Sequence, residues 1–268
     1  MNLITRALLS VAGRQPFNRG PFRRMAIRYL KHHADSPIRS AYRGVPMFFN
    51  LDNPTEQKAL LGHYNNEEVD YLIESIQGHA ANFVDLGANS GFYSQVFLFH
   101  AAPNSRLLAI EPNPEMRARI NANMQLIEDS VRTRNISAIV EASAASDQEA
   151  NLFLNLRSGA GAAYVEEQES GQSICIHTRK LLDMIKQHGL DHIDILKVDI
   201  EGHEDKALIP FFDSAAPVLY PRRIIIEHSS DHMWQADLWG RLHNLGYRET
   251  FRTRGNLIME LPPAVSSD

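Results

Sequence analysis

The chain has 268 residues, of which 44% are hydrophobic and 22% charged, a composition typical of one soluble α/β domain with an extension. No apolar run approaches the roughly 20 residues that a membrane-spanning helix needs, and the single cysteine, Cys175, excludes an intramolecular disulfide. Because the first residues also make a poor signal peptide, we expect a cytoplasmic protein.

The net charge of −5 is distributed unevenly along the chain. Residues 1–43 contain nine basic residues and one acid, a net +8, so the remainder carries −13. A basic arm can make peripheral contact with an anionic membrane or an acidic partner, or it can be a solvated cap on the fold. The sequence leaves these alternatives open, together with the formation of a homo-oligomer, and we expect no nucleic-acid partner.

The first 52 residues are predicted to form a basic, mostly helical extension that ends in an edge strand. Apolar residues recur at helical spacing in its first segment, and Pro46 favours an edge position for the strand. The predicted elements are helices over 2–12 and 22–33, a linker over 37–44 and a strand over 45–51.

A single nucleotide-binding domain is predicted over residues 53–262. Two helices, over 54–61 and 66–76, are followed by a regular alternation of strands and helices. Strands are predicted over 82–86, 106–110, 136–142, 193–199 and 222–227, and helices over 91–100, 114–128, 203–212 and 231–245. This alternation favours a Rossmann-like, doubly wound parallel sheet, and a closing hairpin over 247–261 adds an antiparallel C-terminal strand.

An insertion interrupts this alternation before the fourth strand. Residues 151–156 and 173–177 are predicted to be paired strands, and the segment 157–171 between them is rich in small residues at first and acidic later. A loop of this length in a compact domain is either functional or disordered. We favour a substrate lid over the cofactor crevice.

The stretch 82–93 predicts the centre of the site. An apolar strand ends there in a glycine-containing turn, and a helix follows, which is the usual corner for binding a nucleotide. The turn contributes Gly87, Ala88, Asn89 and Gly91, and the helix begins with Phe92 and Tyr93. Because the spacing is not G-x-G-x-x-G and no Lys-Ser/Thr pair follows, the turn indicates neither a dinucleotide site nor a P-loop.

Two acids select the ligand of this turn. Asp85, at the end of the strand, would repel a pyrophosphate but suits a cationic group such as the α-amino group of S-adenosylmethionine. Glu111 ends the next strand, about twenty residues further on, where an acid can accept hydrogen bonds from both ribose hydroxyls. Pro112 and Asn113 follow it as further cofactor-binding candidates, so the predicted cofactor is S-adenosylmethionine.

Three blocks of the sequence resemble the signature blocks of FkbM-type methyltransferases. They are 84–93, 110–114 and 196–204, and the resemblance runs from about residue 53 to about residue 261. The third block, Lys-x-Asp-x-Glu-Gly-x-Glu, is the most specific, because it is not a general feature of nucleotide-binding folds. The resemblance implies a class I methyltransferase fold, in which an antiparallel last strand lies beside the fifth strand, and usually methylation of a hydroxyl oxygen.

The segment 143–147 follows another strand and is expected to lie near the adenine. Its backbone, at Ala144 for example, would hydrogen-bond to the base, and Asp147 is a candidate partner of the adenine amino group. The alternative is a plain capped turn without a ligand.

Methyl transfer to a hydroxyl requires aligned reactants and a base. The catalytic candidates are Asp199, Glu201, His203, Glu227 and His228, and Asp199 is also a candidate for cofactor binding. Lys197 lies on the same strand face as Asp199, where it could lower the pKa of that acid or form a structural pair. A metal could bind to Asp199, Glu201, Glu227, His228 and His232, but their spacing makes no compact motif and we expect no metal.

We therefore expect an enzyme that O-methylates a hydroxyl of a small molecule, a sugar or a glycolipid. The alternative is a non-catalytic binding protein that keeps the nucleotide fold and associates through its basic arm. Asp85, Glu111 and the third signature block favour the enzyme, because a disused site has no need of them.

Overall fold

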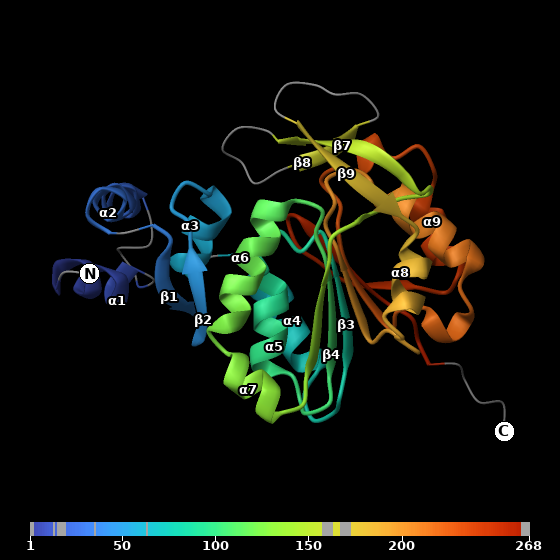
Figure 1. The fold of residues 1–268 in the computed structure, drawn as a ribbon, viewed down its shortest axis with the longest axis horizontal. Helices are drawn as coiled ribbons and strands as arrows, with labels where there is room; N and C mark the ends of the chain where they lie inside the picture. Colours follow the sequence, from blue (N-terminus) through green and yellow to red (C-terminus); the bar gives the residue numbers. More distant parts are fainter. Residues whose placement is uncertain are drawn as a thin grey trace.

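Seven strands form the central sheet, with helices packed on both of its faces (Figure 1). The structure is a computed structural model that describes residues 3–12, 14, 20–34, 36–62, 64–156, 163–166 and 173–263. In spatial order the strands are β12 (Arg248–Arg252), β13 (Asn256–Glu260), β11 (Arg223–Glu227), β10 (Ile195–Val198), β3 (Asn82–Leu86), β4 (Arg106–Ile110) and β5 (Ser137–Glu141).

The topology is that of a doubly wound sheet with an antiparallel end. Strands β11, β10, β3, β4 and β5 pair in parallel, while β13 runs antiparallel between β11 and β12. Every residue of β3 is buried, because a central parallel strand is covered on both faces. The predicted sheet, including its antiparallel C-terminal strand beside the fifth parallel strand, is confirmed.

Two hydrophobic clusters hold the helices to the two faces. Phe83 and Ile195 belong to the first cluster, and Val84 and Leu196 to the second, since successive strand residues point to opposite faces. The first face carries α4 (Asn66–Ser75), α5 (Phe92–His100), α6 (Pro114–Gln125) and α7 (Glu128–Thr133). The second carries α8 (Leu181–Gln187), α9 (Glu204–Ser214) and α10 (Leu238–Asn244).

The N-terminal segments pack on the outside of the first face. They are α1 (Leu3–Ala12), α2 (Gly20–His33), β1 (Ile38–Tyr42), β2 (Val45–Phe49) and α3 (Pro54–Leu60). The predicted linker over 37–44 is wrong for most of its length, because β1 pairs with β2 in a hairpin. Only Ile38 and Tyr42 of this strand are buried, and Arg39, Ser40 and Ala41 lie between them, so the strand has too few large apolar positions to be recognised by alternation.

The first hydrophobic cluster continues through these segments. Leu30 of α2 and Met47 and Phe49 of β2 are buried in it together with Val96 and Phe97 of α5. The cluster therefore crosses the predicted boundary between residues 52 and 53, and the division into two domains stays a prediction.

The insertion forms a second sheet above one end of the central sheet (Figure 1). Its strands, in spatial order, are β6 (Ala144–Ala145), β9 (Ser173–Arg179), β7 (Ala150–Leu156) and β8 (Ala163–Glu166). The predicted pairing of the two flanking strands is confirmed. Strands β7 and β9 are antiparallel, with Asn155 opposite Ser173 at one end and Ala150 opposite Thr178 at the other. Part of the predicted lid loop is instead the strand β8, and the rest of that loop lies outside the described residues.

Three helix predictions needed correction. The helix predicted over 114–128 ends earlier, because α6 stops at Gln125, and the short helices α7 and α8 were not predicted. The helix predicted over 231–245 starts with a separate short turn, η2 (Asp231–Met233), and α10 begins later. Asp237 sets that start, because its side chain accepts a hydrogen bond from Gly240 N at 2.8 Å and caps the helix.

Candidate active site

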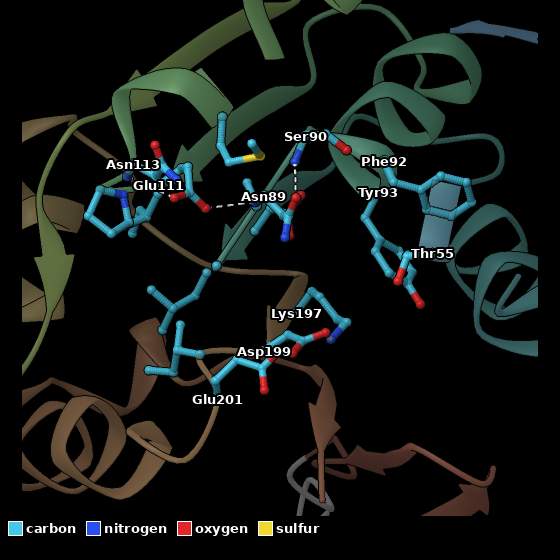
Figure 2. A pocket seen from close by; sticks show the side chains of 18 of the residues that line it. Thr55, Asn89, Ser90, Phe92, Tyr93, Glu111, Asn113, Lys197, Asp199 and Glu201 are labelled. Carbon is cyan, nitrogen blue, oxygen red and sulfur yellow. Dashed lines mark hydrogen bonds and ion pairs between the residues drawn. The ribbon is translucent and has the colours of Figure 1, made fainter. Parts of the chain in front are cut away.

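A pocket opens at the carboxyl ends of β3, β4 and β10 (Figure 2). Such a crevice is where open α/β sheets bind their ligands. It brings together most of the predicted site residues, namely Asp85, Gly87, Ala88, Asn89, Phe92, Tyr93, Glu111, Pro112, Asn113, Ala144, Asp199, Glu201 and His203. Gly91, Asp147 and Glu227 do not line it.

The glycine turn is shaped by close backbone contacts. Gly87 has φ +81°, and a Cβ atom there would lie 1.9 Å from the carbonyl oxygen of Asp199, so no other residue fits. The N–H groups of Gly87 and Ala88 both donate to the carbonyl of Ile110, at 3.0 and 3.1 Å, which fixes the turn to β4. Gly91 serves the packing behind the pocket, because a Cβ atom there would lie 3.1 Å from the side chain of Ile120 on α6.

Glu111 is a buried carboxylate at the rim of this turn. Its Oε2 accepts from Asn89 N and its Oε1 from Asn113 N, each at 2.8 Å. Each carboxylate oxygen can accept more than one hydrogen bond, so both oxygens can still bind the hydroxyls of a diol. Burial raises the pKa of Glu111 to about 7, against the lowering effect of the two backbone N–H groups and of Arg117.

Asp85 lines the pocket where β3 packs against α5. Its side chain is 2% exposed, and Ser94 Oγ of α5 donates to its Oδ2 at 2.6 Å. Lys197 of β10 is its register partner in the neighbouring strand. Burial raises the pKa of Asp85 to about 6, although the hydrogen bond from Ser94 and the charge of Lys197 both lower it.

The end of β10 places a buried cation beside an acid. Lys197 is 1% exposed, and its Nζ lies 3.1 Å from Asp199 Oδ2, 3.3 Å from the carbonyl oxygen of Val198 and 5.4 Å from the centre of the Tyr93 ring. The predicted pairing of Lys197 with Asp199 is confirmed. Figure 2 shows Lys197, Asp199 and Glu201 together on one side of the pocket, away from Glu111.

The turn after Asp199 is held by the last residue of the third signature block. Glu204 is buried, and its Oε1 accepts from Ile200 N at 3.0 Å and from Gly202 N at 3.3 Å. Its Oε2 accepts from Trp234 Nε1 at 2.7 Å. Glu201 adopts φ +55° within this turn. Glu204 therefore fixes the backbone that carries Asp199 and Glu201 to the pocket wall.

His203 lies at the pocket wall with a defined hydrogen bond. Its Nε2 is 3.1 Å from Ser146 Oγ, and Ser146 Oγ donates to Asp147 Oδ1 at 3.0 Å. If the hydroxyl proton of Ser146 is given to Asp147, the tautomer of His203 that fits this contact has its proton on Nε2 and a lone pair on Nδ1. Burial first, and then the charge of Lys206, lower the pKa of His203, which keeps it neutral at neutral pH. Asp147 itself is exposed, whereas Ala144 and Ala145 line the pocket.

Glu227 lies at the end of β11, outside the pocket wall. Burial, and then the charges of Asp199 and Glu201, raise its pKa to about 8. Ser229 Oγ donates to its Oε1, while its Oε2 is buried and has no hydrogen-bond partner among the described residues. Glu227 is therefore protonated at neutral pH, which is the wrong state for a base.

No metal centre is formed by the part of the chain that the structure describes, since no group of three or more His, Cys, Asp or Glu side chains there could hold an ion. His228 is directed elsewhere, because its Nε2 lies 3.2 Å from the carbonyl oxygen of Thr253. His232 is exposed on η2.

One wall of the pocket was not predicted from the sequence. It consists of β2, α3 and the residues around them, and it contributes Met47, Phe48, Phe49, Asn53, Thr55, Glu56, Ala59 and Tyr64. Met116 and Asn123 of α6 and Leu154 and Val165 of the insertion complete the lining. These residues share no spacing or motif, so only the packing of distant elements reveals them.

Comparison with known proteins identifies the segment that carries the site. Residues 85–249 match the family model described as the methyltransferase FkbM domain. No curated protein matches the sequence of this chain.

Several solved structures are similar to the chain. They include the methyltransferase FkbM from Methylobacillus flagellatus KT, at 17% identity and a TM-score of 0.43, covering 77% of this chain and 54% of that one. Another is precorrin-6y C5,15-methyltransferase from Geobacter metallireducens GS-15, at 12% identity and 0.41, covering 74% and 88%. A third is the N-terminal domain of human METTL16 in complex with SAH, at 13% and 0.41, covering 74% and 68%. The chain thus spans about half the length of the FkbM structure.

Proposed function

Because this chain belongs to the FkbM methyltransferase family, we propose that it transfers a methyl group to a hydroxyl oxygen of a small molecule, a sugar or a glycolipid. The fold is that of class I S-adenosylmethionine-dependent methyltransferases, and S-adenosylmethionine is the cofactor. The observation that carries the proposal is that the end of β10 and the glycine turn, which are far apart in the sequence, line one pocket.

The residues of the pocket fit the cofactor. Gly87 gives the turn a backbone without a side chain, as a ligand lying against it requires. Glu111 offers two carboxylate oxygens to a ribose diol, and Ala144 and Ala145 form a small apolar wall for a base. When bound, the cofactor supplies a methyl group on a positively charged sulfonium. The leaving group is a neutral thioether, so it needs no metal to leave.

The acids near the end of β10 suit that positive charge. Asp85, Asp199 and Glu201 all line the pocket, and Asp85 is the most buried of the three. Lys197 balances the charge of one of these acids, Asp199, with which it forms an ion pair. We expect the remaining negative potential to favour a cationic ligand in this part of the pocket.

His203 is our choice for the base that accepts the hydroxyl proton. It lines the pocket, its lowered pKa keeps it neutral, and in the tautomer that donates to Ser146 its Nδ1 has a lone pair that can accept a proton. Asp199, one oxygen of which is held by Lys197, is the second candidate and would orient the acceptor or the cofactor. Glu227 is not proposed, because it holds its proton at neutral pH.

The proposal is tested with His203→Asn, Asp199→Asn and, as a matched control, the exposed His243→Asn. Turnover of labelled S-adenosylmethionine is measured with a pool of hydroxylated acceptors, and affinity for S-adenosylhomocysteine is measured by calorimetry. We expect His203→Asn to lower turnover by about 10²–10⁴-fold with affinity unchanged. A loss confined to affinity in Asp199→Asn would make that residue a cofactor-binding residue.

Two outcomes would contradict the proposal. Binding of S-adenosylhomocysteine without transfer to any acceptor would favour the non-catalytic binding protein. A product methylated on nitrogen would keep the enzyme and overturn O-methylation.

A further inference from the structure

Glu56 of α3 is a buried acid in the unpredicted wall of the pocket, outside the segment that matches the family model. It is 6% exposed. Its Oε2 accepts a hydrogen bond from Asn50 N at 2.6 Å and forms an ion pair with Arg119 of α6. Its Oε1 is also buried, and within the described part of the chain it has no hydrogen-bond partner. Buried carboxylate oxygens are almost always hydrogen-bonded. A ligand that donates a hydrogen bond to Oε1 would explain why the described residues leave this oxygen without a donor.

The position of Glu56 is tied to the cofactor turn through α6. Arg119, which holds Glu56, lies four residues before Asn123, so the two side chains are one helical turn apart, about 6 Å along the helix. Asn123 Nδ2 donates to the carbonyl of Ser90 in the glycine turn at 2.9 Å, and its Oδ1 accepts from Phe48 N of β2 at 2.7 Å. Glu56 is thus fixed near the turn by the same helix that supports the turn.

Aromatic side chains line the same wall of the pocket as Glu56. Phe48 and Tyr64 line the pocket, and Phe92 of the cofactor helix packs edge-on against Tyr64 with ring centres 4.9 Å apart. The face of an aromatic ring carries partial negative charge and attracts weakly positive C–H groups. A wall that combines aromatic rings with the Glu56 acceptor suits a ligand with C–H faces and hydroxyl groups.

The charge at Glu56 selects the kind of donor. Arg119 already balances the carboxylate, so the free oxygen sits in a neutral pair. An ammonium ion would place a second cation beside Arg119, whereas a hydroxyl donates its proton without adding charge. The free oxygen therefore favours a hydroxyl over an amine.

We propose that Glu56 binds a hydroxyl group of the methyl acceptor, and that the acceptor is a sugar ring or similar polyol lying against Phe48 and Tyr64. This inference rests on the proposed function and names the substrate class of the same pocket. It gives the N-terminal segments a role in acceptor recognition, separate from the cofactor residues of the family segment.

The test uses the full chain saturated with S-adenosylhomocysteine and a panel of methyl glycosides, each paired with its mono-deoxy analogues. Binding is measured by saturation-transfer NMR. The variants are Glu56→Gln and, as a matched control, Glu115→Gln, which changes an exposed acid on α6. In Glu56→Gln the donors Asn50 N and Arg119 hold the amide oxygen, so the NH₂ group replaces the free acceptor oxygen.

We expect at least one methyl glycoside to bind the wild type, and one of its deoxy analogues to bind about tenfold more weakly. In Glu56→Gln that difference should disappear and the parent glycoside should bind about tenfold more weakly, while Glu115→Gln behaves as the wild type. Affinity for S-adenosylhomocysteine should stay within twofold in both variants, which also shows that they fold.

Three results would overturn the inference. A hydroxyl dependence that persists in Glu56→Gln would place the hydroxyl elsewhere. A loss of S-adenosylhomocysteine affinity in Glu56→Gln alone would make Glu56 a cofactor residue. If the wild type binds the cofactor but none of the glycosides, the acceptor is not a sugar, and the methyltransferase proposal stands. If the wild type does not bind the cofactor, the proposed function itself is contradicted.

Discussion

Glu111 changes its charge near neutral pH, and this links the residue to the stability of the fold. Its pKa rises from an ordinary value of 4.5 to about 7 in the folded protein. Between these values the folded chain binds more protons than the unfolded chain, so the free energy of unfolding should fall as pH rises through that window. At about 1.4 kcal/mol per pH unit, the decrease due to Glu111 between pH 5 and pH 8 should be about 2–3 kcal/mol. Urea unfolding at pH 5 and pH 8 of the wild type and Glu111→Gln measures it; equal pH dependence in both would contradict it.

Cofactor affinity should rise as Glu111 loses its proton, whereas the free energy of unfolding falls. Ribose hydroxyls donate to the charged carboxylate, so affinity for S-adenosylhomocysteine should rise from pH 6 to pH 8, with release of a proton on binding near pH 7. Calorimetry in buffers with different ionisation enthalpies measures the proton release. Glu111→Gln should bind about tenfold or more weakly and release no proton at this site. Unchanged affinity in the variant would place the ribose elsewhere.

Alanine substitutions at Gly87 and Gly78 distinguish the cost of a left-handed backbone from the cost of steric overlap with a neighbour. Both have positive φ, at +81° and +79°, but only Gly87 has a neighbour where a Cβ atom would lie, the Asp199 carbonyl at 1.9 Å. Gly78→Ala should lower the free energy of unfolding by about 1–2 kcal/mol, the cost of the left-handed conformation. Gly87→Ala should lower it by about 3 kcal/mol or more, because the turn and the end of β10 must separate. Thermal or urea unfolding gives both values, and equal losses would contradict the close approach.

At the scale of elements, Asn123 joins α6 to two segments from other parts of the chain. Its side-chain Oδ1 accepts a hydrogen bond from Phe48 N of β2, and its Nδ2 donates to the Ser90 carbonyl of the glycine turn. Its backbone carbonyl accepts from Gln95 Nε2 at 2.8 Å. Asn123→Ala leaves a buried donor and a buried acceptor unpaired, which should cost about 2–4 kcal/mol of stability and weaken cofactor binding. The exposed Asn121→Ala, on the same helix, should cost well under 1 kcal/mol. Similar losses in the two variants would show that the junction contributes little.

At the scale of the whole molecule, the charge asymmetry suggests a surface contact. The arm over 1–43 carries +8, and the apolar side chains of Ile4 and Met25 in it are each 64% exposed. Within the described ranges, every helix is too short or too polar to cross a bilayer. We propose that the arm binds anionic membrane surfaces peripherally, because basic residues are attracted to such surfaces and apolar side chains can enter the interface.

Vesicle flotation tests this contact. Arg24 and Arg28 are exposed on α2, and the double change to Glu should lower binding to anionic vesicles by tenfold or more at low salt. The control makes the same change in net charge at Arg248 and Arg254, which are exposed near the C-terminal hairpin. Binding by the wild type should weaken at high salt and be absent with neutral vesicles. If both double variants lower vesicle binding equally, the binding depends on the net charge of the protein and not on the arm.

The sequence by itself determined the sheet and the half of the pocket that the ends of its strands form. The strand, turn and helix over 82–93 follow from a local apolar run and glycines, and Glu111 follows from its place at the end of the next strand. Parallel strands connected in right-handed fashion bring their carboxyl ends to one edge, so a residue at a strand end can be placed without knowing the packing around it.

Only the tertiary structure decided the other half. It showed β1 where a linker was expected, placed Glu227 outside the pocket wall and Asp147 at the surface, and brought Glu56, Phe48 and Tyr64 to the pocket. Glu56 reaches this wall through its ion pair with Arg119, 63 residues further along the chain. Local patterns of polar and apolar residues predict which side of an element is buried, but not which distant element covers it, since that depends on how the complete surfaces fit together.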